Sequence, residues 1–548
     1  MHATEVDVVE VPAHPELWDY SEADWPHLTL HGALDRACEE HGPATVAWSY
    51  VDEGVDLTLG AARERARDWA SSMVAAGVRP GDRVAVCLGA THLWPIVQLA
   101  IGQCGAAIVS VNIRYRTHEL RHVLATSKPT LVLTSGDTDR LALATLVRDT
   151  VADVAGETRS PAAPVVVVDG AVPDGCVTDD RFLAVRDDET AATRRAAVGV
   201  EDTVLIQFTS GSTAAPKGVE LSHDAVLTTA FQVGRAAGLG PSDVVYSALP
   251  FYHVGGSICT GVAPYVVGSR MVVPQRYEAL GSVRQMIDHA CTAVQGHAAM
   301  FTMQIDAARD AGLLAELRLT KGWAAAPPSV MRRIAHEMGI AGVVPVYGMS
   351  EFGLIAAGSR LEALEARVAD MGSPPPGADV RVRYLPGEEM GEIEVRGRQM
   401  LSRYHGAPEA TRLALTADGW LRTGDLARLG ADGRPTFAGR AKDMIKPGGE
   451  NVSAAEVEEF LVTHPDIASA AVIGIPDDRL GEAVAAVIAT RPGSRVDLAA
   501  VQGFCEGAIA SFKTPKAVFV VDALPIFPNG KVDKRSVRNR WGQGKETN

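Results

Sequence analysis

Short apolar runs that alternate with amphipathic segments constrain the fold of this chain more than any other feature. The runs lie at 83–88, 130–134, 164–168 and 204–208. Segments with helical periodicity, such as 117–126 and 283–289, supply helices around them. Strands that are apolar along their whole length are typical of sheets covered on both faces. The alternation therefore predicts a layered α/β domain.

The chain is too long for a single hydrophobic core. It has 548 residues, and cores stop growing well before that length. From about Arg381 the strands become shorter and turns more frequent, and a second pattern of helices and strands follows at 453–463, 469–475, 483–488, 498–509 and 517–521. We therefore predict an α/β large N-terminal domain with layered sheets and helices over residues 1–438, and a small α+β C-terminal domain over residues 443–548.

Charge and cysteine usage narrow the class of partner. The net charge of -15 argues against nonspecific binding to nucleic acid or to anionic membranes. The seven cysteines are scattered without a C-x-x-C pair, which predicts a reducing cytosol and neither a zinc site nor a disulfide frame. The beginning of the chain has acidic residues and prolines where a secretory signal needs a basic end and an apolar run. We expect a cytoplasmic protein that acts on a small molecule.

One apolar stretch, residues 93–111, is long enough to be compared with a membrane span. Pro95, Gln98 and Gln103 interrupt it. A spanning helix needs about 20 predominantly apolar residues. The stretch therefore predicts a helix, a turn and a buried strand, and no membrane span.

The strongest chemical signal is a loop rich in hydroxyl groups and glycine, directly after the apolar run that ends at Phe208. It reads Thr209-Ser210-Gly211-Ser212-Thr213-Ala214-Ala215-Pro216-Lys217-Gly218. Hydroxyl groups, backbone N–H groups and a lysine in one loop can surround a polyphosphate. The loop differs from the Walker pattern, which needs Gly-Lys-Ser/Thr, because Pro216 precedes the lysine and Gly218 follows it. A flexible polar surface loop would tolerate this composition but would not require its order.

Further motifs follow this loop in a fixed order. They are Tyr347-Gly348-Met349-Ser350-Glu351, Thr423-Gly424-Asp425, the run from Gly439 to Val452 and Pro528-Asn529-Gly530-Lys531. With these motifs the chain resembles the adenylate-forming superfamily of acyl-CoA synthetases, nonribosomal adenylation domains and luciferase, over about residues 30–535. The resemblance implies ATP-dependent activation of a carboxylic acid as acyl-AMP, release of pyrophosphate and transfer of the acyl group to a thiol.

The resemblance also assigns roles around the nucleotide. It implies that Tyr347 stacks on adenine, that Ser350 reaches the α-phosphate and that Glu351 holds Mg²⁺. A hard cation bound to phosphate oxygens needs only one or two protein carboxylates. Asp425, expected in a tight turn, and Arg440 match contacts to the ribose. Ala325-Ala326-Pro327 stands where relatives have a Gly-Gly-Ala-Pro loop against adenine, so the alanines reduce the room for backbone approach.

Catalysis and domain movement are implied in the same way. A basic cluster near a C-terminus is by itself usually solvated, but the resemblance implies that Lys531 bridges the carboxylate and the α-phosphate, with Lys217 and Glu351 as the other catalytic residues. It places a hinge at 439–442 with Lys442 at the pivot, which makes the C-terminal domain mobile. It assigns the thiol tunnel to Gly448, Gly449 and Glu450.

The acid is the least determined part of the site. His253 matches a family segment that gates the acyl pocket, and Gly296, His297 and Met300 lie where many fatty-acid-activating relatives read Gly-Val-Pro-Thr-Met-Phe. His297 is either a polar group of the pocket or a satisfied core histidine, and its residue type favours the latter. Fatty, aryl and specialised-metabolite acids all remain open.

The acceptor and the function class also leave alternatives. We expect coenzyme A as the acceptor, and a ligase that loads the phosphopantetheine of an acyl carrier protein would share every motif. AMP activation of an unusual non-fatty acid in specialised metabolism is a further alternative. A non-enzymatic nucleotide-binding protein is the contrast from another class, and intact Lys217, Glu351 and Lys531 argue against it.

Overall fold

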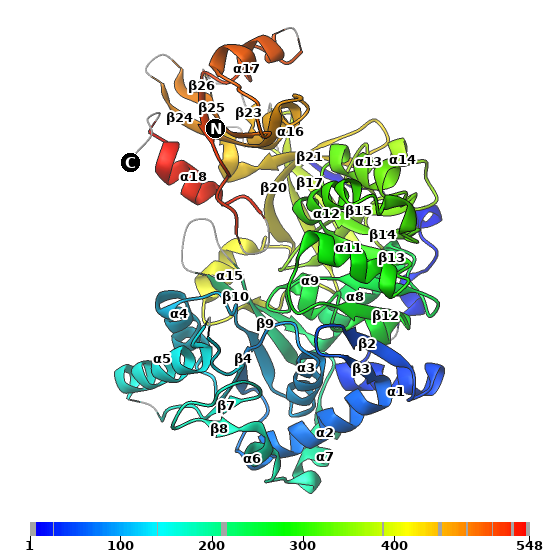
Figure 1. The fold of residues 1–548 in the computed structure, drawn as a ribbon, viewed down its shortest axis with the longest axis vertical. Helices are drawn as coiled ribbons and strands as arrows, with labels where there is room; N and C mark the ends of the chain where they lie inside the picture. Colours follow the sequence, from blue (N-terminus) through cyan, green and yellow to red (C-terminus); the bar gives the residue numbers. More distant parts are fainter. Residues whose placement is uncertain are drawn as a thin grey trace.

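The computed structural model describes residues 7–25, 27–139, 141–159, 161–209, 216–385, 388–445, 447, 452–477, 480–506, 508–527 and 531–543. Figure 1 shows a small unit, coloured orange to red, above a larger body that holds the rest of the chain. In the described ranges, no helix is long and apolar enough to cross a membrane.

The first large sheet has eight strands and is mostly parallel. Its order is β19-β10-β9-β5-β4-β6-β7-β8. The strands are β19 (Arg403–Tyr404), β10 (Lys217–Ser222), β9 (Thr203–Thr209), β5 (Ala107–Ser110), β4 (Arg83–Cys87), β6 (Leu131–Thr134), β7 (Val165–Val167) and β8 (Val177–Thr178). The strands predicted at 83–88, 130–134, 164–168 and 204–208 are confirmed as β4, β6, β7 and β9.

The second large sheet also has eight strands, parallel in the middle and antiparallel at both edges. Its order is β16-β15-β14-β13-β11-β12-β2-β3. The strands are β16 (Gly353–Ala357), β15 (Gly342–Met349), β14 (Lys321–Ala325), β13 (Ala293–His297), β11 (Val244–Ser247), β12 (Arg270–Val273), β2 (Val46–Tyr50) and β3 (Val55–Thr58).

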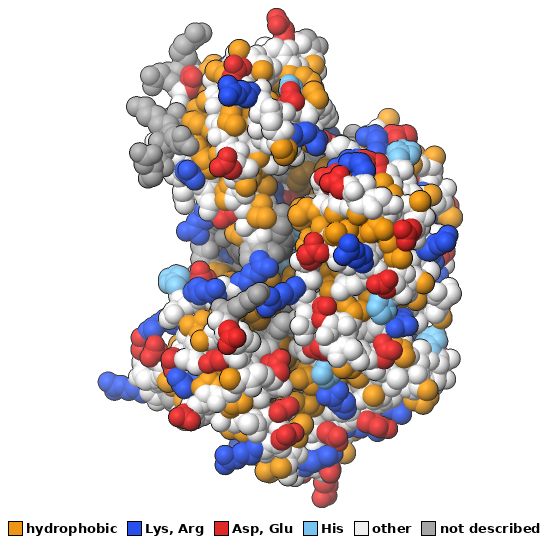
Figure 2. Space-filling view, in the orientation of Figure 1, with side chains coloured by type: hydrophobic (Ala, Val, Ile, Leu, Met, Phe, Trp, Pro, Cys, Tyr) orange, Lys and Arg blue, Asp and Glu red, His pale blue; other side chains and the backbone are white. Residues whose placement is uncertain are grey.

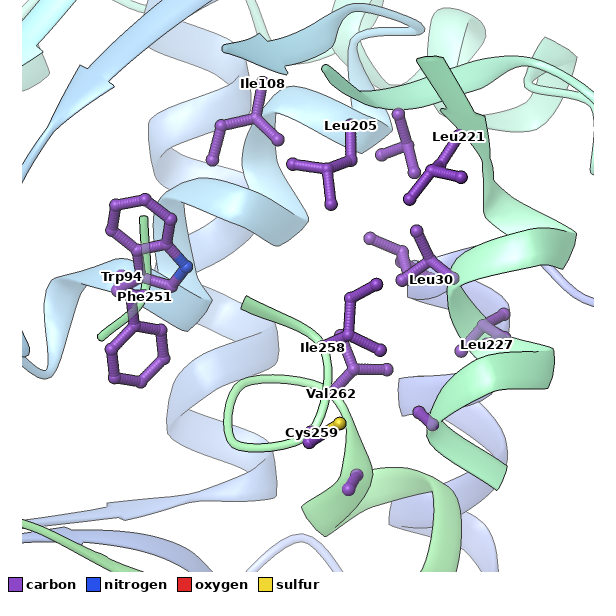
Figure 3. Packing of buried hydrophobic residues seen from close by; sticks show 14 of the residues in the cluster. Leu30, Trp94, Ile108, Leu205, Leu221, Leu227, Phe251, Ile258, Cys259 and Val262 are labelled. Carbon is purple, nitrogen blue, oxygen red and sulfur yellow. The ribbon is translucent and has the colours of Figure 1, made fainter. Parts of the chain in front are cut away.

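Helices fill the space between these two sheets. In α3 (Leu93–Gln103) every residue is buried, and α8 (His223–Ala236) is buried along most of its length. A helix that is apolar on all sides belongs in a core, so the predicted helix, turn and strand at 93–111 are confirmed as α3 and β5. Figure 3 shows side chains from strands and helices meeting in this layer, among them Ile108, Leu205 and Leu227.

Two short helices among the rest, α9 (Val254–Ser257) and α10 (Ala263–Val267), are also buried, and the other helices of the large body lie around the sheets. These others are α1 (Leu30–His41), α2 (Leu59–Ala75), α4 (Thr117–Ser127), α5 (Leu143–Thr158), α6 (Asp179–Leu183), α7 (Asp188–Ala197), α11 (Ala279–Asp288), α12 (Ala298–Asp310), α13 (Pro328–Glu337), α14 (Leu364–Arg367) and α15 (Pro408–Ala414). The helices predicted at 117–126 and 283–289 are confirmed as α4 and α11.

A third, antiparallel sheet adjoins the small unit. It comprises β1 (Asp7–Glu10), β17 (Ala378–Tyr384), β18 (Gly391–Gly397), β20 (Leu421–Leu429) and β21 (Pro435–Arg440). The expected tight turn at Thr423-Gly424-Asp425 is wrong, because these residues lie inside β20. Glu392 pairs with Leu426 and Glu394 with Arg422, so the three residues form a bulge, and Gly424 has φ +71°.

The small unit has the predicted α+β composition. It comprises β22 (Met444–Ile445), β23 (Val452–Ser453), α16 (Ala454–Leu461), β24 (Ile467–Asp477), β25 (Gly481–Thr490), α17 (Leu498–Cys505), β26 (Ala517–Val521) and α18 (Lys534–Trp541). The helix expected to reach Ile509 ends at Cys505, where Ala508 N–H bonds back to the Cys505 carbonyl. Two apolar clusters, one on each face of the β24–β26 sheet, contain only residues from Ile445 onward among the described part of the chain.

Candidate active site

The two ends of the predicted phosphate loop lie side by side. Thr209 ends β9 and Lys217 begins β10, and the two residues pair across these strands. Ser210, Gly211, Ser212 and Thr213 lie outside the described residues. Gly218 follows Lys217 where a Cβ atom would stand 2.9 Å from the Ile206 Cγ2 atom, so only glycine lets the two strands approach at this point.

Lys217, Tyr404 and Glu351 form one cluster. The Tyr404 hydroxyl donates a hydrogen bond to Glu351 Oε1 over 2.9 Å, and Lys217 Nζ lies 5.2 Å from the centre of the Tyr404 ring. Glu351 is half-buried just after β15, and its carbonyl accepts from Leu401 N–H at 2.7 Å. Burial raises the pKa of Tyr404, and the nearby Glu351 carboxylate raises it further. The tyrosine therefore stays a donor that holds the carboxylate.

Tyr404 was missed by the sequence analysis. It comes to Glu351 because β19 pairs with the edge of β10, where Tyr404 lies opposite Val219. β19 has only two residues, so it has no periodicity that a sequence could reveal. The strand that it pairs with, β10, lies far away along the chain.

The second cluster is built on the bulge in β20. The bulge turns Asp425 inward, where the Tyr347 hydroxyl donates to its Oδ2 over 2.6 Å and Arg440 Nε stands 2.9 Å from its Oδ1. The side chain of Asp425 is 4% exposed, and its two oxygens face a tyrosine hydroxyl and a guanidinium. Burial, followed by the Asp425 charge, raises the pKa of Tyr347 well above its usual range.

The aromatic ring of Tyr347 lies beside Phe437. The two ring centroids are 6.1 Å apart, and Phe437 is 41% exposed although it is a large apolar side chain. Phe437 was also missed by the sequence analysis. The neighbours of Tyr347 in the predicted motif, Gly348 and Met349, end β15, and Ser350 follows them.

The strands β13 and β14 end at the same edge. His297, the last residue of β13, pairs with Ala325, the last residue of β14. Ala325 and Pro327 are exposed and Ala326 is half-buried, and Pro327 caps α13. The carboxyl ends of parallel strands form the usual ligand crevice of open α/β sheets. The loop predicted against adenine thus lies beside a residue predicted in the acyl pocket.

His253 lies at the N-cap of α9, and its Nδ1 accepts a hydrogen bond from Gly255 N–H at 3.2 Å. Burial, followed by the positive charge of Lys531 and then by His297, lowers the pKa of His253 to about 4. The imidazole is therefore neutral at pH 7. At Gly256 a Cβ atom would lie 2.2 Å from the Pro250 carbonyl oxygen, so this turn requires glycine.

His297 is half-buried, and burial followed by the charge of Lys531 lowers its pKa to about 4. His297 is thus only partly buried and lies near a lysine of the small unit, which does not fit the fully buried core histidine that its residue type favoured. Met300 is buried in the first turn of α12. A Cβ atom at Gly296 would make ordinary contacts with Phe301 at 3.4 Å and with Met300 Sδ at 3.6 Å.

Lys531 brings the small unit into this site. Desolvation, followed by the charge of Arg440, lowers the pKa of Lys531, and Asp425 opposes the shift. The charge of Lys531 also lowers the pKa of His253 and of His297, so this residue of the small unit lies near both histidines of the large body. Figure 2 shows the molecule hollowed between the small unit and the larger body.

The hinge and thiol-tunnel residues are described only in part. Lys442 lies in a single 3-10 turn, Ala441–Asp443, directly after β21. Gly448, Gly449 and Glu450 lie outside the described residues. Their assignment stays a prediction.

The chain is similar to known proteins over most of its length. Residues 34–405 match the family model described as AMP-binding enzyme, and residues 456–531 match that of the AMP-binding enzyme C-terminal domain. A sulfoacetate–CoA ligase of Cupriavidus necator is 32% identical over 89% of this chain and 93% of its own. A 3-[(3aS,4S,7aS)-7a-methyl-1,5-dioxo-octahydro-1H-inden-4-yl]propanoyl:CoA ligase of Rhodococcus jostii is 33% identical over 93% of this chain and 98% of its own. The crystal structure of ATP-bound MatB from Rhodopseudomonas palustris superimposes with a TM-score of 0.81 at 26% identity, and covers 94% of this chain and 99% of that one.

Proposed function

The chain belongs to the AMP-binding enzyme family, and from this premise we propose how its site performs the reaction of an AMP-forming acid–CoA ligase. The enzyme uses ATP to convert a carboxylic acid into an acyl-AMP and joins the acyl group to coenzyme A. The residue roles below are our proposal.

The observation that carries the proposal is the position of Lys531. This lysine comes from the small unit, yet its charge acts on Asp425, Arg440, His253 and His297 of the large body. In the first half-reaction a carboxylate oxygen forms a bond to the α-phosphorus of ATP while the bond to pyrophosphate breaks. Two anions must approach each other, so a preorganised cation between them stabilises the transition state. We assign this role to Lys531, and the binding of the departing phosphates to Lys217.

The nucleoside is assigned to the cluster around Asp425. A carboxylate oxygen has more than one lone pair, so Asp425 Oδ1 can accept from a ribose hydroxyl as well as face Arg440. The Tyr347 hydroxyl is already bonded to Asp425, which fixes the plane of its ring. We assign the adenine to the space between that ring and Ala325, Ala326 and Pro327.

Glu351 fits the role of the Mg²⁺ ligand. It offers one half-buried carboxylate close to Lys217, and Tyr404 holds one of its oxygens in place. A magnesium ion bound with the phosphates commonly uses only one or two protein carboxylates. When bound, the ion would neutralise phosphate charge.

The second half-reaction is attack of the thiol sulfur on the acyl-AMP carbonyl, which forms the thioester and releases AMP. We assign its path to Gly448, Gly449 and Glu450, brought in by rotation of residues 443–548 about Lys442. The names of the relatives above are those of CoA ligases, which supports coenzyme A as the acceptor and gives no support to a carrier protein.

We infer that His253, Gly296, His297 and Met300 line the acyl pocket. The two relatives named above have similar identity to this chain, and their names specify very different acids. Overall similarity therefore does not determine which acid is bound. The residues that line the acyl pocket determine it. Two neutral histidines give this wall hydrogen-bonding groups that an aliphatic pocket lacks.

Pyrophosphate release across a panel of fatty, aryl and short polar acids tests the proposal, with coenzyme A or a carrier protein as the acceptor. We expect AMP and pyrophosphate in equal amounts with at least one acid, and thioester only with coenzyme A. Formation of ADP and phosphate would overturn the proposed chemistry. Transfer only to the carrier protein would overturn the proposed acceptor.

A further inference from the structure

A line of buried polar side chains runs behind the wall that carries His253 and His297. Gln295 lies in β13, Trp323 in β14 and Ser247 in β11, and Thr260 lies between α9 and α10. All four are at most 7% exposed. Buried polar groups are costly unless each finds a partner, and here each one does.

The donors of this line point in one direction. An indole N–H can only donate, and Trp323 Nε1 donates to Gln295 Oε1 over 2.9 Å. This contact fixes the amide, so Gln295 Nε2 donates to Ser247 Oγ over 2.9 Å. Ser247 Oγ lies 2.6 Å from Thr260 Oγ1, and Thr260 Oγ1 donates to the Gly255 carbonyl over 3.3 Å. Gln295 Nε2 also lies within donating distance of Thr260 Oγ1, at 3.1 Å, and of the Cys259 carbonyl, at 3.2 Å. With Gln295 as the donor and the Gly255 carbonyl as the last acceptor, the Ser247 hydroxyl donates to Thr260.

The line ends at the residue that holds His253. Gly255 N–H donates a hydrogen bond to His253 Nδ1. A backbone N–H can only donate, so Nδ1 is the acceptor and carries no proton. Burial and Lys531 keep the imidazole neutral at pH 7, with its pKa lowered to about 4. A neutral imidazole carries one proton, which is therefore on Nε2. In the opposite tautomer two N–H groups would face each other at Gly255.

We propose that Gln295 and Thr260 are positioning residues, which hold the Gly255 backbone so that His253 presents a neutral Nε2–H donor to the carboxylate of the acid. The inference rests on the proposed acyl pocket. A neutral donor suits this place because an imidazolium would be repelled by Lys531, whose charge is needed there. The carboxylate would gain a hydrogen bond without a second buried cation.

The test uses the Thr260→Val variant of the full-length enzyme, which removes the last donor of the line and keeps the side-chain volume. Thr260→Ser keeps the hydroxyl and serves as the conservative variant. Thr150→Val is the matched control, because Thr150 is a buried threonine that donates to the Leu146 carbonyl of its own helix, α5. ¹⁵N chemical shifts of the labelled histidine ring report the tautomer, and the His253→Gln variant identifies the resonance.

We expect the wild type, Thr260→Ser and Thr150→Val to show the Nε2–H tautomer, and Thr260→Val to show a mixture. The KM of the acid should rise about tenfold in Thr260→Val, the effect of one hydrogen bond, with the KM of ATP unchanged within about twofold. An Nδ1–H tautomer in the wild type would overturn the proposal. So would a Thr260→Val variant with the tautomer and acid KM of Thr150→Val. The chemical shifts need no substrate, so they decide the inference even if no acid in the panel is activated.

Discussion

Tyr404 and Glu351 are 53 residues apart in the chain, and the hydroxyl of the first donates to a carboxylate oxygen of the second over 2.9 Å. The same tyrosine presents the face of its ring to Lys217 Nζ. One side chain therefore sets the positions of both the anion and the cation that we assign to the phosphates. Mutations of Tyr404 can test its hydrogen bond to Glu351 and its ring contact with Lys217 separately.

Tyr404→Phe removes the hydrogen bond and keeps the ring. We expect the rate of pyrophosphate release to fall by about 10- to 100-fold, because a hydrogen bond to a charged group contributes about 1.5–3 kcal/mol. Titration calorimetry of Mg·ATP should show weaker binding. Tyr404→Leu, which also removes the ring under Lys217, should lose more than Tyr404→Phe. Equal rates in the two variants would contradict a role for the ring.

Glu351→Gln removes the negative charge and keeps the size of the side chain. The amide oxygen can still accept from Tyr404, so we expect a folded protein with an unchanged circular dichroism spectrum. Pyrophosphate release should fall by at least about 100-fold, the order of magnitude for the loss of a preorganised electrostatic contact. A well-folded variant that releases pyrophosphate at the normal rate would remove Glu351 from the site.

His297→Phe replaces a polar group of the proposed acyl wall by an apolar group. We expect the order of preference within the acid panel to change, with better relative rates for apolar acids, and the KM of ATP to stay within about threefold. Steady-state kinetics on the panel measures both. Impaired ATP binding with an unchanged preference would place the pocket elsewhere.

Lys531→Ala tests the alternation of the small unit. It should lose about 10²- to 10³-fold in acyl-AMP formation, yet convert a preformed acyl-AMP to thioester at a nearly normal rate. Gly449→Leu should show the reverse defect, with pyrophosphate released and little thioester made, because the resemblance assigns Gly449 to the thiol tunnel. Each half-reaction is measured alone for both variants. Equal losses in both steps would count against two separate arrangements.

Stability should fall as the pH falls below about 6.5, because His31 and His223 are buried in the core. Burial, followed by Arg195, lowers the pKa of His31 to about 4, and burial, followed by His31, lowers that of His223 to about 3, both from 6.5. Above pH 6.5 both histidines are mostly neutral in the folded and in the unfolded state. Below it only the unfolded chain binds protons, until the folded pKa values are reached. Each histidine then adds a slope of about 1.4 kcal/mol per pH unit.

Urea unfolding between pH 7.5 and pH 5 measures this slope. His223→Gln retains an acceptor for the Leu30 N–H that His223 Nδ1 binds, and should flatten the curve. The exposed His336 gives the matched control, since His336→Gln should run parallel to the wild type. If the His223→Gln curve also runs parallel to that of the wild type, His223 does not cause the loss of stability at low pH.

Much of the fold could be predicted from local pattern. Strands such as β4 and β9 are apolar along their length because both faces are covered, and that pattern survives in the sequence. The turn expected at Thr423-Gly424-Asp425 failed because glycine and aspartate mark a bulge within a strand as readily as a turn. Only the pairing with β18 distinguishes the two.

The candidate site was predictable where a motif is contiguous, as with Tyr347 and Glu351. Tyr404, Phe437 and Gln295 escaped prediction because their partners lie on other strands. His297 was interpreted from its residue type as a core histidine. Its surroundings depend on Lys531, more than 200 residues later in the chain, and no local pattern encodes that proximity.

The small unit carries its own hydrophobic clusters, built among the described residues only from Ile445 onward. A change in its orientation therefore leaves both interiors packed and costs only contacts at the boundary. The balance between orientations can then be set by the few kcal/mol with which a bound ligand prefers one of them. Units that unfold independently also absorb heat separately. Calorimetry of the ligand-free enzyme should accordingly resolve two endotherms. A tightly bound acyl-AMP that contacts both units should bring the temperatures of the two endotherms closer to each other.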